Sequence, residues 1–478
     1  MESIVTENLV SFKELEKKIF QYVCELGRKI TRIMLENYDR ELAERRDKKQ
    51  YRNKGKRSTT IKTVYGEVTY GRNVYRTKTE DGETAYIYLL DEAMHMDKIG
   101  LISTNLAEKI AMTITESPYR ATADTISSTC GQSISAGGVW NLIQQLGERI
   151  DEEELHAVKQ MDADQTEGEA VIPVLFEEMD GVWLHMQDKK HKKMKKQEMK
   201  VFTMYEGWDA SKKNRSTLVG KTMLAGMEKS REFHEKREAL IRKKYNADEI
   251  EQRILNGDGG SWIKEPYDPD VIFQLDRYHI YQEILRKLSD KRAQNEAREL
   301  FESEKIKELL EFIRIYADSV DSADEKDTRA KKARELYQYL NNNREGLLPY
   351  QKQGKQIPEP KEGIEYRGMG VQESQNCTVI TMRMKHRRMR WSESGANHLA
   401  KVLCRKENRE LIDTIERYTD GLLFTLQMRE VIEILSASKA PKKDGKGSTY
   451  KELIERHVPL MDAVMTGARK VFREAFVR

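Results

Sequence analysis

The sequence predicts an α/β protein in which a mainly helical N-terminal region, containing a β-ribbon, precedes a strand-rich core. Apolar residues recur at helical spacing over residues 8–46 and again over 103–150. Short apolar runs that end in acidic residues follow from residue 171. Residues 290–345 are highly charged and contain neither Pro nor Gly, which indicates a helical insertion. A chain of 478 residues is long for one core, so roughly two to four domains are expected.

Composition excludes several classes of protein. Charged residues make up 34% of the chain, yet the net charge is only +4, so opposite charges are segregated locally. No run of about 18 apolar residues occurs, so we predict no transmembrane helix and no membrane partner. The first residues lack the basic and apolar segments of a secretion signal. Four scattered cysteines without CxxC spacing argue against a zinc site or a disulfide framework, and a reducing cytoplasm is expected.

An amphipathic helix is predicted for the first segment, residues 1–48. Its apolar residues are three or four positions apart, with charges between them. Such a helix either packs on its own protein or, because the spacing approaches a heptad pattern, binds a partner or a second copy. The apolar positions are Phe12, Leu15, Ile19, Val23, Leu26, Ile30 and Ile33.

The second segment, residues 49–100, is predicted to form a basic β-ribbon. Two alternating runs lie around Gly66 and Gly71, and a basic stretch precedes them. Basic side chains on a ribbon can contact the phosphates of a nucleic acid, although a solvated hairpin without a ligand would show the same pattern. The candidate phosphate contacts are Arg52, Lys54, Lys56 and Arg57.

Residues 101–150 are predicted to contain a helix-turn-helix. The first helix would cover 121–128, and Ser135 would cap the second. A helix-turn-helix places its second helix in the major groove, where Asn141 and Gln145 could read adenine edges. The alternative is a helical hairpin with a purely structural role.

The core is predicted to begin at residue 171, after an acidic linker over 151–170. VIPVLFEEMD indicates a strand and GVWLHMQ a strand that returns from it, which would put Asp180 in the middle of a hairpin. A lysine-rich turn then leads to a third strand, KVFTMYEGW. Asp188 and Glu198 belong to that lysine-rich stretch and are interpreted as solvated.

Two further acidic residues follow short buried strands within the first part of the core, 171–289. Asp258 follows ILNG, and Asp276 ends DVIFQLD, with His279 three residues later at the start of a helix. The Asp276–His279 pair could hydrogen-bond, orient DNA or join a metal site, and Asp276 could instead cap the helix. The helical insertion is predicted over 290–350, and the core is completed, with C-terminal helices, over 365–478.

Three acids from distant positions, Asp180, Asp258 and Glu373, could together hold two divalent metal ions for phosphodiester chemistry. Taken singly, both aspartates are also common turn residues. Glu393 is the rival for the third acid, and Glu178 and Glu365 are further candidates.

A basic segment, RMKHRRMRW, follows Glu373 and could hold a phosphate backbone across the site, or could form a solvated helix face. No GxxxxGK[ST] phosphate loop, GxSxG elbow or HExxH motif occurs, so ATP hydrolysis, α/β-hydrolase and zinc-protease chemistry are not expected. The basic residues of this segment are Arg383, Lys385, Arg387, Arg388 and Arg390.

The order DG, GDG, D-x-x-H and E-S-x-N resembles the DDE transposases of prokaryotic insertion sequences, in a group allied to the Mutator-like clan and long catalogued as an uncharacterised protein family. YRNKGKRSTTIKTVYGEVTY, GDGGSWIK and the RMK and RWSESGA elements extend the resemblance over nearly the whole chain. Together these elements are specific, whereas each alone is weak.

The resemblance implies a ribonuclease-H-like catalytic core with a helical insertion. Asp180 would be the first acid, on the first strand, and Asp258 the second, after the fourth strand. Glu373 would be the third, on a late helix with Ser374 and Asn376. The clan often has a cysteine where this chain has Asp276, which leaves the role of that acid open.

The resemblance also implies an activity and its partners. A DDE transposase is a metal-dependent polynucleotidyl transferase that uses two Mg²⁺ ions, with Mn²⁺ able to replace them. Its partner is double-stranded DNA, both the terminal inverted repeats and the target, and it acts as a homo-oligomer on DNA at the nucleoid in the bacterial cytoplasm. The alternatives are a non-catalytic DNA-binding regulator derived from a transposase and a ribonuclease-H-like nuclease without strand transfer.

Overall fold

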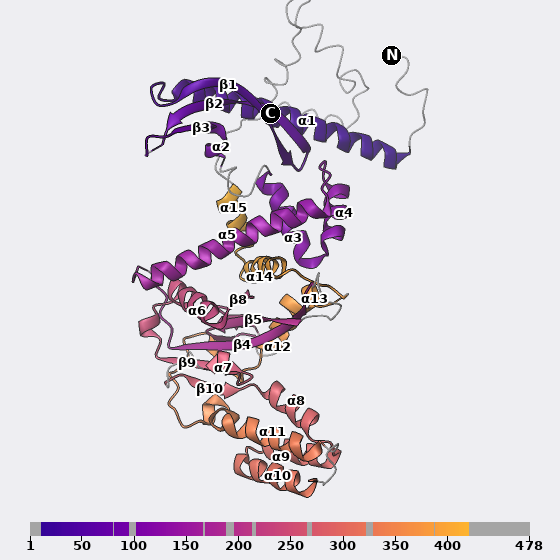
Figure 1. The fold of residues 1–478 in the computed structure, drawn as a ribbon, viewed down its shortest axis with the longest axis vertical. Helices are drawn as coiled ribbons and strands as arrows, with labels where there is room; N and C mark the ends of the chain where they lie inside the picture. The colour runs from indigo at the N-terminus through magenta and orange to yellow at the C-terminus, as the bar shows by residue number, and fades with distance from the viewer. Residues whose placement is uncertain are drawn as a thin grey trace, which may run out of the picture. The chain divides into compact units, whose positions relative to one another are not determined.

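A five-stranded mixed β-sheet positions the predicted acids (Figure 1), and its strand order is β10-β9-β4-β5-β8. β4 pairs antiparallel with β5 and parallel with β9, β9 pairs parallel with β10, and β5 pairs antiparallel with β8. The bounds are β4 (Val174–His185), β5 (Lys196–Tyr205), β8 (Thr222–Gly226), β9 (Gln252–Gly257) and β10 (Ile272–Leu275).

The computed structural model describes most of the chain up to residue 419. The described ranges are 11–79, 81–94, 102–165, 168–187, 196–212, 217–264, 270–321, 328–386 and 388–419.

Both faces of the sheet are covered, since the apolar residues of β4 point alternately to opposite faces and pack in three cores, one of which holds Val174 and Phe176. Leu175 and Met179 pack in a core with Phe233 of α6, while Val182 and Leu184 pack in another with residues of α5 and α14. β4 is buried along most of its length, with apolar residues toward both ends and three buried acids, Glu177, Glu178 and Asp180, in its middle. The covering helices are α5 (Ala136–Asp162), α6 (Ser230–Lys244), α7 (Ser261–Lys264) and α14 (Glu393–Glu407).

The hairpin predicted around Asp180 is wrong. β4 runs through Asp180 and Gly181 without a turn, and its pairing with β5 is continuous from Phe176 opposite Tyr205 to His185 opposite Lys196. The Asp-Gly pair therefore lies in mid-strand, where the ladder of β5 satisfies its backbone groups.

The predicted N-terminal helix and β-ribbon are confirmed. α1 starts with a capping box between Ser11 and Glu14. The buried Asp39 accepts hydrogen bonds from the backbone and side-chain nitrogens of Asn73, which fixes α1 on β2. The start of the helix exposes apolar side chains, with Phe12 74% exposed. The elements are α1 (Phe12–Arg45), β1 (Arg52–Thr63), β2 (Gly66–Lys78), β3 (Thr84–Ile87) and α2 (Leu89–Ala93).

Three helices follow: α3 (Thr104–Glu116), α4 (Tyr119–Thr129) and α5. Ser135 caps α5 as predicted, accepting a hydrogen bond from the backbone of Gly138. The linker predicted from residue 151 is wrong, because α5 continues to Asp162. Its acidic residues are held by ion pairs, for example Asp151 with Lys236 at 2.6 Å.

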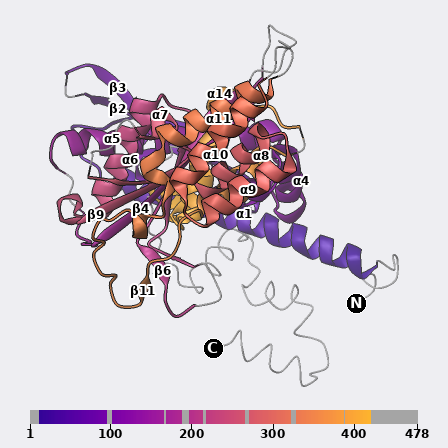
Figure 2. The same cartoon turned by 90° about the horizontal axis from the view of Figure 1, so that it is seen from below.

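The predicted insertion is helical, and its helices lie together with α8 (Figure 2). They share an apolar core that includes Phe301, Ile313 and Leu336 and extends to Leu275 of β10. The helices of the insertion are α9 (Lys291–Glu302), α10 (Ile306–Ser319) and α11 (Arg329–Asn342), and α8 (Arg277–Lys287) shares their core.

The remaining described elements are short. β6 (Gly207–Asp209), β7 (Leu218–Val219) and β11 (Ile364–Glu365) form a small sheet. α12 (Gln372–Gln375) continues through a π-helical segment, Asn376–Thr381, into α13 (Met382–Met384), and α15 (Leu411–Thr419) ends the described chain. The predicted C-terminal helices beyond 419 lie outside the described residues, among which no helix has the length and apolar character to cross a membrane. Three 3₁₀ turns are Ala247–Glu249, Arg344–Leu347 and Tyr350–Lys352.

Candidate active site

The buried carboxylate of Glu178 fixes α12 beside β4. Glu178 is fully buried in β4, and five hydrogen-bond donors surround its two oxygens. Three of these donors are consecutive backbone N–H groups that lead into α12, so the carboxylate acts as an anchor for the start of this helix. The donors are Tyr205 Oη (2.6 Å), Asn256 Nδ2 (3.1 Å), Gly370 N (3.0 Å), Val371 N (3.2 Å) and Gln372 N (3.0 Å).

The anchored helix brings Asn376 to Asp180. Nδ2 of Asn376 donates to Oδ2 of Asp180 at 2.7 Å, and Nε2 of Gln372 donates to Oδ1 of Asn376 at 2.8 Å. The amide of Asn376 is therefore oriented from one side and holds Asp180 on the other. The contact lies where the helix changes to π-helical geometry, which often occurs at functional sites.

Asp258 follows the end of β9, the parallel neighbour of β4. Gly257 is opposite Met179 in the ladder, so Asp258, just after the end of β9, and Asp180, within β4, lie at nearly the same level. The backbone N–H of Gly260 donates to Oδ1 of Asp258 at 2.8 Å. Burial raises the pKa of Asp258, and the nearby charge of Asp180 raises it further, although the hydrogen bond from Gly260 opposes the shift.

His279 supplies a positive charge beside these acids. Its Nε2 lies 3.6 Å from Oδ1 of Asp180. Burial opposes the charged form, but the hydrogen bond and charge of Asp180, with the charges of Asp276 and Asp258, outweigh it and raise the pKa of His279 to about 9. The imidazole is therefore protonated at neutral pH.

Asp276 caps α8, since its Oδ1 accepts a hydrogen bond from the backbone of Tyr278 at 3.0 Å. The capping alternative is thus confirmed, and the cap turns His279 toward Asp180. Burial raises the pKa of Asp276 to about 6, and the charges of Glu178 and Asp180 add to this rise.

A further acid near the site, Glu198, was misinterpreted from sequence as a solvated turn residue. It lies in β5, partly buried, and reaches across Gly181, where a Cβ atom would clash with its Oε1. Burial raises the pKa of Glu198, and the charges of Asp258 and Asp180 contribute to the rise. The alternation of polar and apolar residues in QEMKVFTMY could have extended the predicted third strand, KVFTMYEGW, back to Glu198.

The candidates for a third acid lie in different places. Glu373 is exposed on α12, and its spacing of three from Asn376 puts it on a neighbouring part of the helix surface. Glu393 is also exposed, but Trp391 hydrogen-bonds with His185, five residues and roughly 17 Å along β4 from Asp180. The geometry therefore favours Glu373. Of the other two candidates, Glu178 is the structural anchor described above and Glu365 lies in the small sheet with β6.

The predicted DNA contact of Arg383 is contradicted by its burial. The side chain is 5% exposed, donates to the carbonyl of Ile114 at 2.6 Å and lies near the rings of Tyr119 and Trp391. Burial lowers the pKa of Arg383 to about 10. Its guanidinium thus joins α3 and α4 to the segment after α13 and cannot reach a phosphate.

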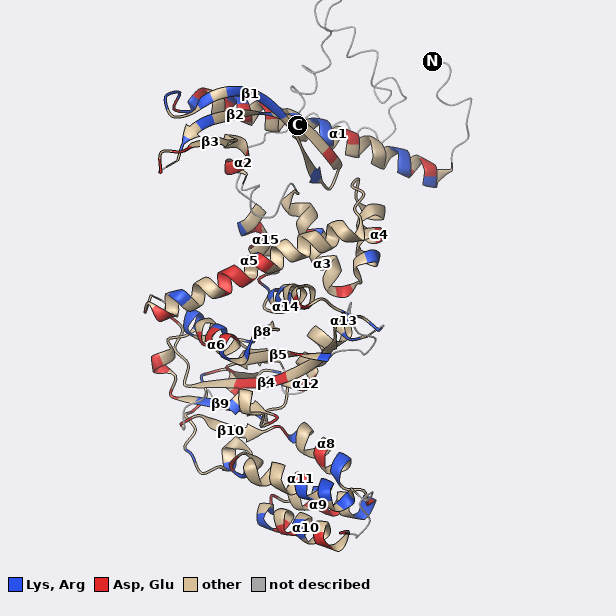
Figure 3. Cartoon of the chain, in the orientation of Figure 1, with Lys and Arg blue, Asp and Glu red and all other residues tan. Residues whose placement is uncertain are grey.

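The other predicted DNA contacts within the described residues are exposed. Figure 3 shows the concentration of basic residues along β1. Arg387 and Asp188 lie outside the described residues. The exposed residues are Arg52, Lys54, Lys56 and Arg57 on β1, Asn141 and Gln145 on α5, and Lys385, Arg388 and Arg390 after α13.

A second acidic cluster is already neutralised by lysines. Asp151, Glu154 and Glu228 have carboxylate oxygens close enough together to hold a metal ion. Lys401 reaches all three, at 3.0, 2.5 and 2.7 Å, and Lys236 contacts Asp151 and Glu228 at 2.6 and 2.7 Å. The two ammonium groups occupy the position that a cation would take, so this cluster is a buried ion-pair network that joins α5, α6 and α14.

The chain belongs to uncharacterised protein family UPF0236, whose family model matches residues 5–417. Two UPF0236 proteins of Caldanaerobacter subterraneus subsp. tengcongensis are similar to it. One is 26% identical over 409 residues, which cover 83% of this chain and 78% of the relative. The other is 26% identical over 416 residues, which cover 83% of this chain and 77% of the relative. The name of the first relative joins eleven gene loci of that bacterium.

Substitution of the anchor should destabilise the protein. Glu178→Ala leaves five donors without their acceptor, three of them in buried hydrogen bonds, so we expect the free energy of unfolding to fall by at least ~2 kcal/mol in urea denaturation. Glu373→Ala, at an exposed position on the adjoining helix, should change it by no more than about 0.5 kcal/mol. Equal stability of the two variants would show that Glu178 does not hold α12.

The His279–Asp180 pair should make stability depend on pH in the metal-free protein. The pKa of His279 rises from 6.5 to about 9 on folding. The stabilisation is therefore complete below pH 6.5 and is lost as the pH rises through about 9. In urea titrations with a chelator present, wild type should exceed His279→Gln in stability at pH 6.5 and lose that advantage by pH 9.5. An advantage that stays constant across this range would contradict the ion pair.

Proposed function

We propose that this chain is a DNA transposase of the DDE type with a ribonuclease-H-like core. The observation that carries the proposal is the placement of Asp180 and Asp258 on the five-stranded sheet. Asp180 lies on β4, the first strand of that sheet along the chain, and Asp258 follows β9, the fourth. These are the positions that the resemblance to DDE transposases implies for the first two acids, on adjacent parallel strands.

The carboxylate oxygens at this site are suitable ligands for Mg²⁺. Magnesium prefers hard oxygen ligands, and Asp180, Asp258 and Glu373 offer carboxylates. Burial and mutual repulsion raise the pKa of Asp258, and a cation between the acids would relieve that repulsion. Two Mg²⁺ ions bound there would supply activation of the attacking oxygen and stabilisation of the leaving oxygen during phosphodiester cleavage.

The neighbouring side chains fix the positions of the acids and reduce the repulsion between them. Asn376 restrains one oxygen of Asp180. His279 keeps a positive charge near the other oxygen, which lowers the repulsion between the acids and attracts a phosphate. The cap at Asp276 orients His279, and the anchor at Glu178 brings the helix of Glu373 to the same edge of the sheet.

The proposed reaction has two displacements at phosphorus. Water attacks the phosphodiester at the end of the element and releases a 3′-hydroxyl. That hydroxyl then attacks a phosphodiester of the target DNA, so that one P–O bond forms as another breaks and no covalent protein–DNA intermediate is needed. The exposed basic residues of β1 and of 385–390 would bind the DNA backbone, with an affinity that falls as salt rises.

The family adds support of a different kind. A relative whose single name joins eleven loci of one bacterium indicates a gene present in many copies. Such multiplicity is typical of mobile elements, whereas a chromosomal regulator or housekeeping nuclease is usually encoded once or a few times.

Loss of any ligand carboxylate should remove activity while DNA binding persists. Asp180→Asn, Asp258→Asn and Glu373→Gln should each reduce cleavage at the element's ends at least ~100-fold, or about 2.7 kcal/mol in activation free energy. Cleavage and strand transfer would be followed on a plasmid that carries the ends, with Mg²⁺ or Mn²⁺, and binding by fluorescence anisotropy without either metal.

Glu393→Gln is the matched control and should retain activity. Loss of cleavage in Glu393→Gln with retention in Glu373→Gln would move the third acid to Glu393. Cleavage without joining in the wild type would indicate a nuclease, and retained cleavage in both aspartate variants would refute the metal site.

A further inference from the structure

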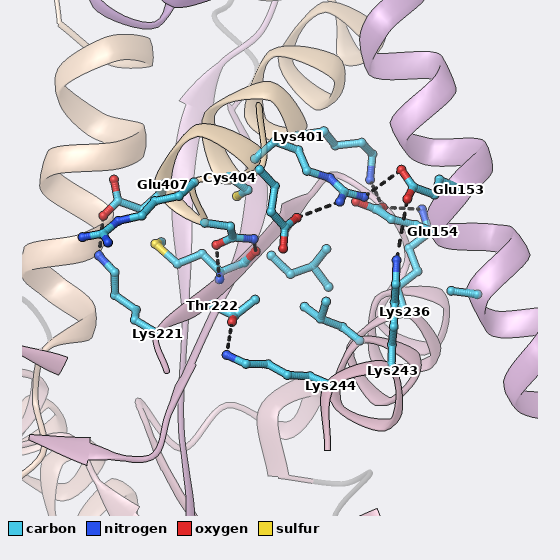
Figure 4. A pocket seen from close by; sticks show the side chains of 18 of the residues that line it. Glu153, Glu154, Lys221, Thr222, Lys236, Lys243, Lys244, Lys401, Cys404 and Glu407 are labelled. Atoms are coloured by element: carbon cyan, nitrogen blue, oxygen red, sulfur yellow. Dashed lines mark hydrogen bonds and ion pairs between the residues drawn. The ribbon is translucent and has the colours of Figure 1, made fainter. Parts of the chain in front are cut away.

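A cavity of about 580 Å³ lies apart from the candidate active site, between α5, α6, α14 and the edge strand β8 (Figure 4). This volume is within the range of roughly 300–1,000 Å³ that is typical of small-molecule sites. Seven lysine and arginine side chains and four glutamates line the cavity. Most of these cations are in ion pairs with carboxylates, including Lys236 and Lys401 with Asp151 and Glu228, so any positive charge open to a ligand comes from the few that are weakly paired.

The ion-pair network of Asp151, Glu154, Glu228, Lys236 and Lys401 fixes the walls of this cavity. It ties α5, α6 and α14 together at buried positions. The two lysines of the network are engaged with its carboxylates and are not available to a ligand. The cavity is therefore held open by contacts that do not depend on what it binds.

Lys244 at the end of α6 is partly buried at the cavity and has no carboxylate in direct contact among the described residues. Its Nζ donates to the carbonyl of Gly220 and, at 2.7 Å, to Oγ1 of Thr222, both neutral oxygens, and Figure 4 shows the contact with Thr222 at the cavity. Burial lowers the pKa of Lys244, although Glu206 and Glu410 oppose this shift. An anion in the cavity could accept a charge-assisted hydrogen bond from Lys244 in place of one of these neutral oxygens.

Two further cations can join Lys244. The side chain of Lys243 is 52% exposed and only approaches Glu153, at 3.6 Å. Arg409 is exposed, and the described residues give it no ion pair. Lys243, Lys244 and Arg409 together could neutralise a ligand with more than one negative charge, such as a chain of phosphates.

Part of the remaining lining is apolar. Leu218, Leu224 and Leu240 contribute to the wall together with the cations. A ligand that pairs phosphates with a flat apolar group matches this combination, and a nucleotide has both. We propose that the cavity binds a nucleoside phosphate, either a free nucleotide or a nucleotide unit of a DNA strand.

The cavity also has a direct link to the helix of Glu373. Lys221 lines the cavity, and its Nζ donates to Oε1 of Gln375 in α12 at 3.0 Å, while a second contact joins it to Glu407. A bound nucleotide would therefore lie one side chain away from α12.

The test uses the full chain and fluorescently labelled ATP as the probe, followed by anisotropy. Lys244→Met should weaken binding about tenfold or more, the loss of one charge-assisted hydrogen bond. Lys243→Glu, at a half-exposed position that tolerates substitution, should weaken it similarly. Lys229→Met, at an exposed position beside the opposite end of α6 and outside the cavity, is the matched control and should bind as wild type does.

A parallel titration with labelled DNA distinguishes the two sources of the nucleotide. If the two cavity variants lose ATP binding but keep DNA binding, and the control keeps both, the ligand is a free nucleotide. If ATP does not bind but both cavity variants, and not the control, weaken DNA binding, the nucleotide belongs to a DNA strand. If neither ligand responds to the cavity variants, the proposal is overturned. Asp180→Asn should bind ATP normally, so failure of the transposase proposal would leave this one intact.

Discussion

The rest of the site depends on one buried charge, the carboxylate of Glu178. Burying a carboxylate is unfavourable unless hydrogen bonds replace its hydration, and five donors do so here. Because those donors come from β5, β9 and the segment before α12, the same requirement fixes three parts of the chain around β4. Asp180, two residues along the strand, is thereby placed between Asn376 and His279.

The two acidic clusters differ in how their negative charge is compensated. Around Asp151, two ammonium groups neutralise the carboxylates within hydrogen-bonding distance, and the result is a rigid joint between helices. Around Asp180 and Asp258, the imidazolium of His279 lies beside the acids, while Glu198 adds a further acid nearby that Lys200 partly offsets. The second arrangement places several acids together beside the middle of β4, where we propose that a divalent cation binds.

Local patterns in the sequence predicted most of the elements but not how they meet. Periodicity located α1 and the ribbon, and the buried run before Asp258 located β9. The Asp-Gly pair at 180–181 suggested a turn, because turn preference can be read from neighbouring residues. The pairing with β5 overrides that preference, and it involves residues about 20 positions away, which a local pattern does not show. The basic run around Arg383 suggested a phosphate contact. The sequence could not show that Arg383 is buried, because its hydrogen bond is to Ile114, 269 positions away along the chain. The donors to Glu178 come from distant parts of the chain and left no local signal.

Anomalous diffraction from crystals grown with Mn²⁺ tests the central claim most directly. The account predicts Mn²⁺ between Asp180 and Asp258, with the carboxylate of Glu373 turned toward the same position, and no peak among Asp151, Glu154 and Glu228, where lysines already lie. Absence of Mn²⁺ at the aspartates at saturating concentration, or its presence only at the lysine-filled cluster, would contradict it.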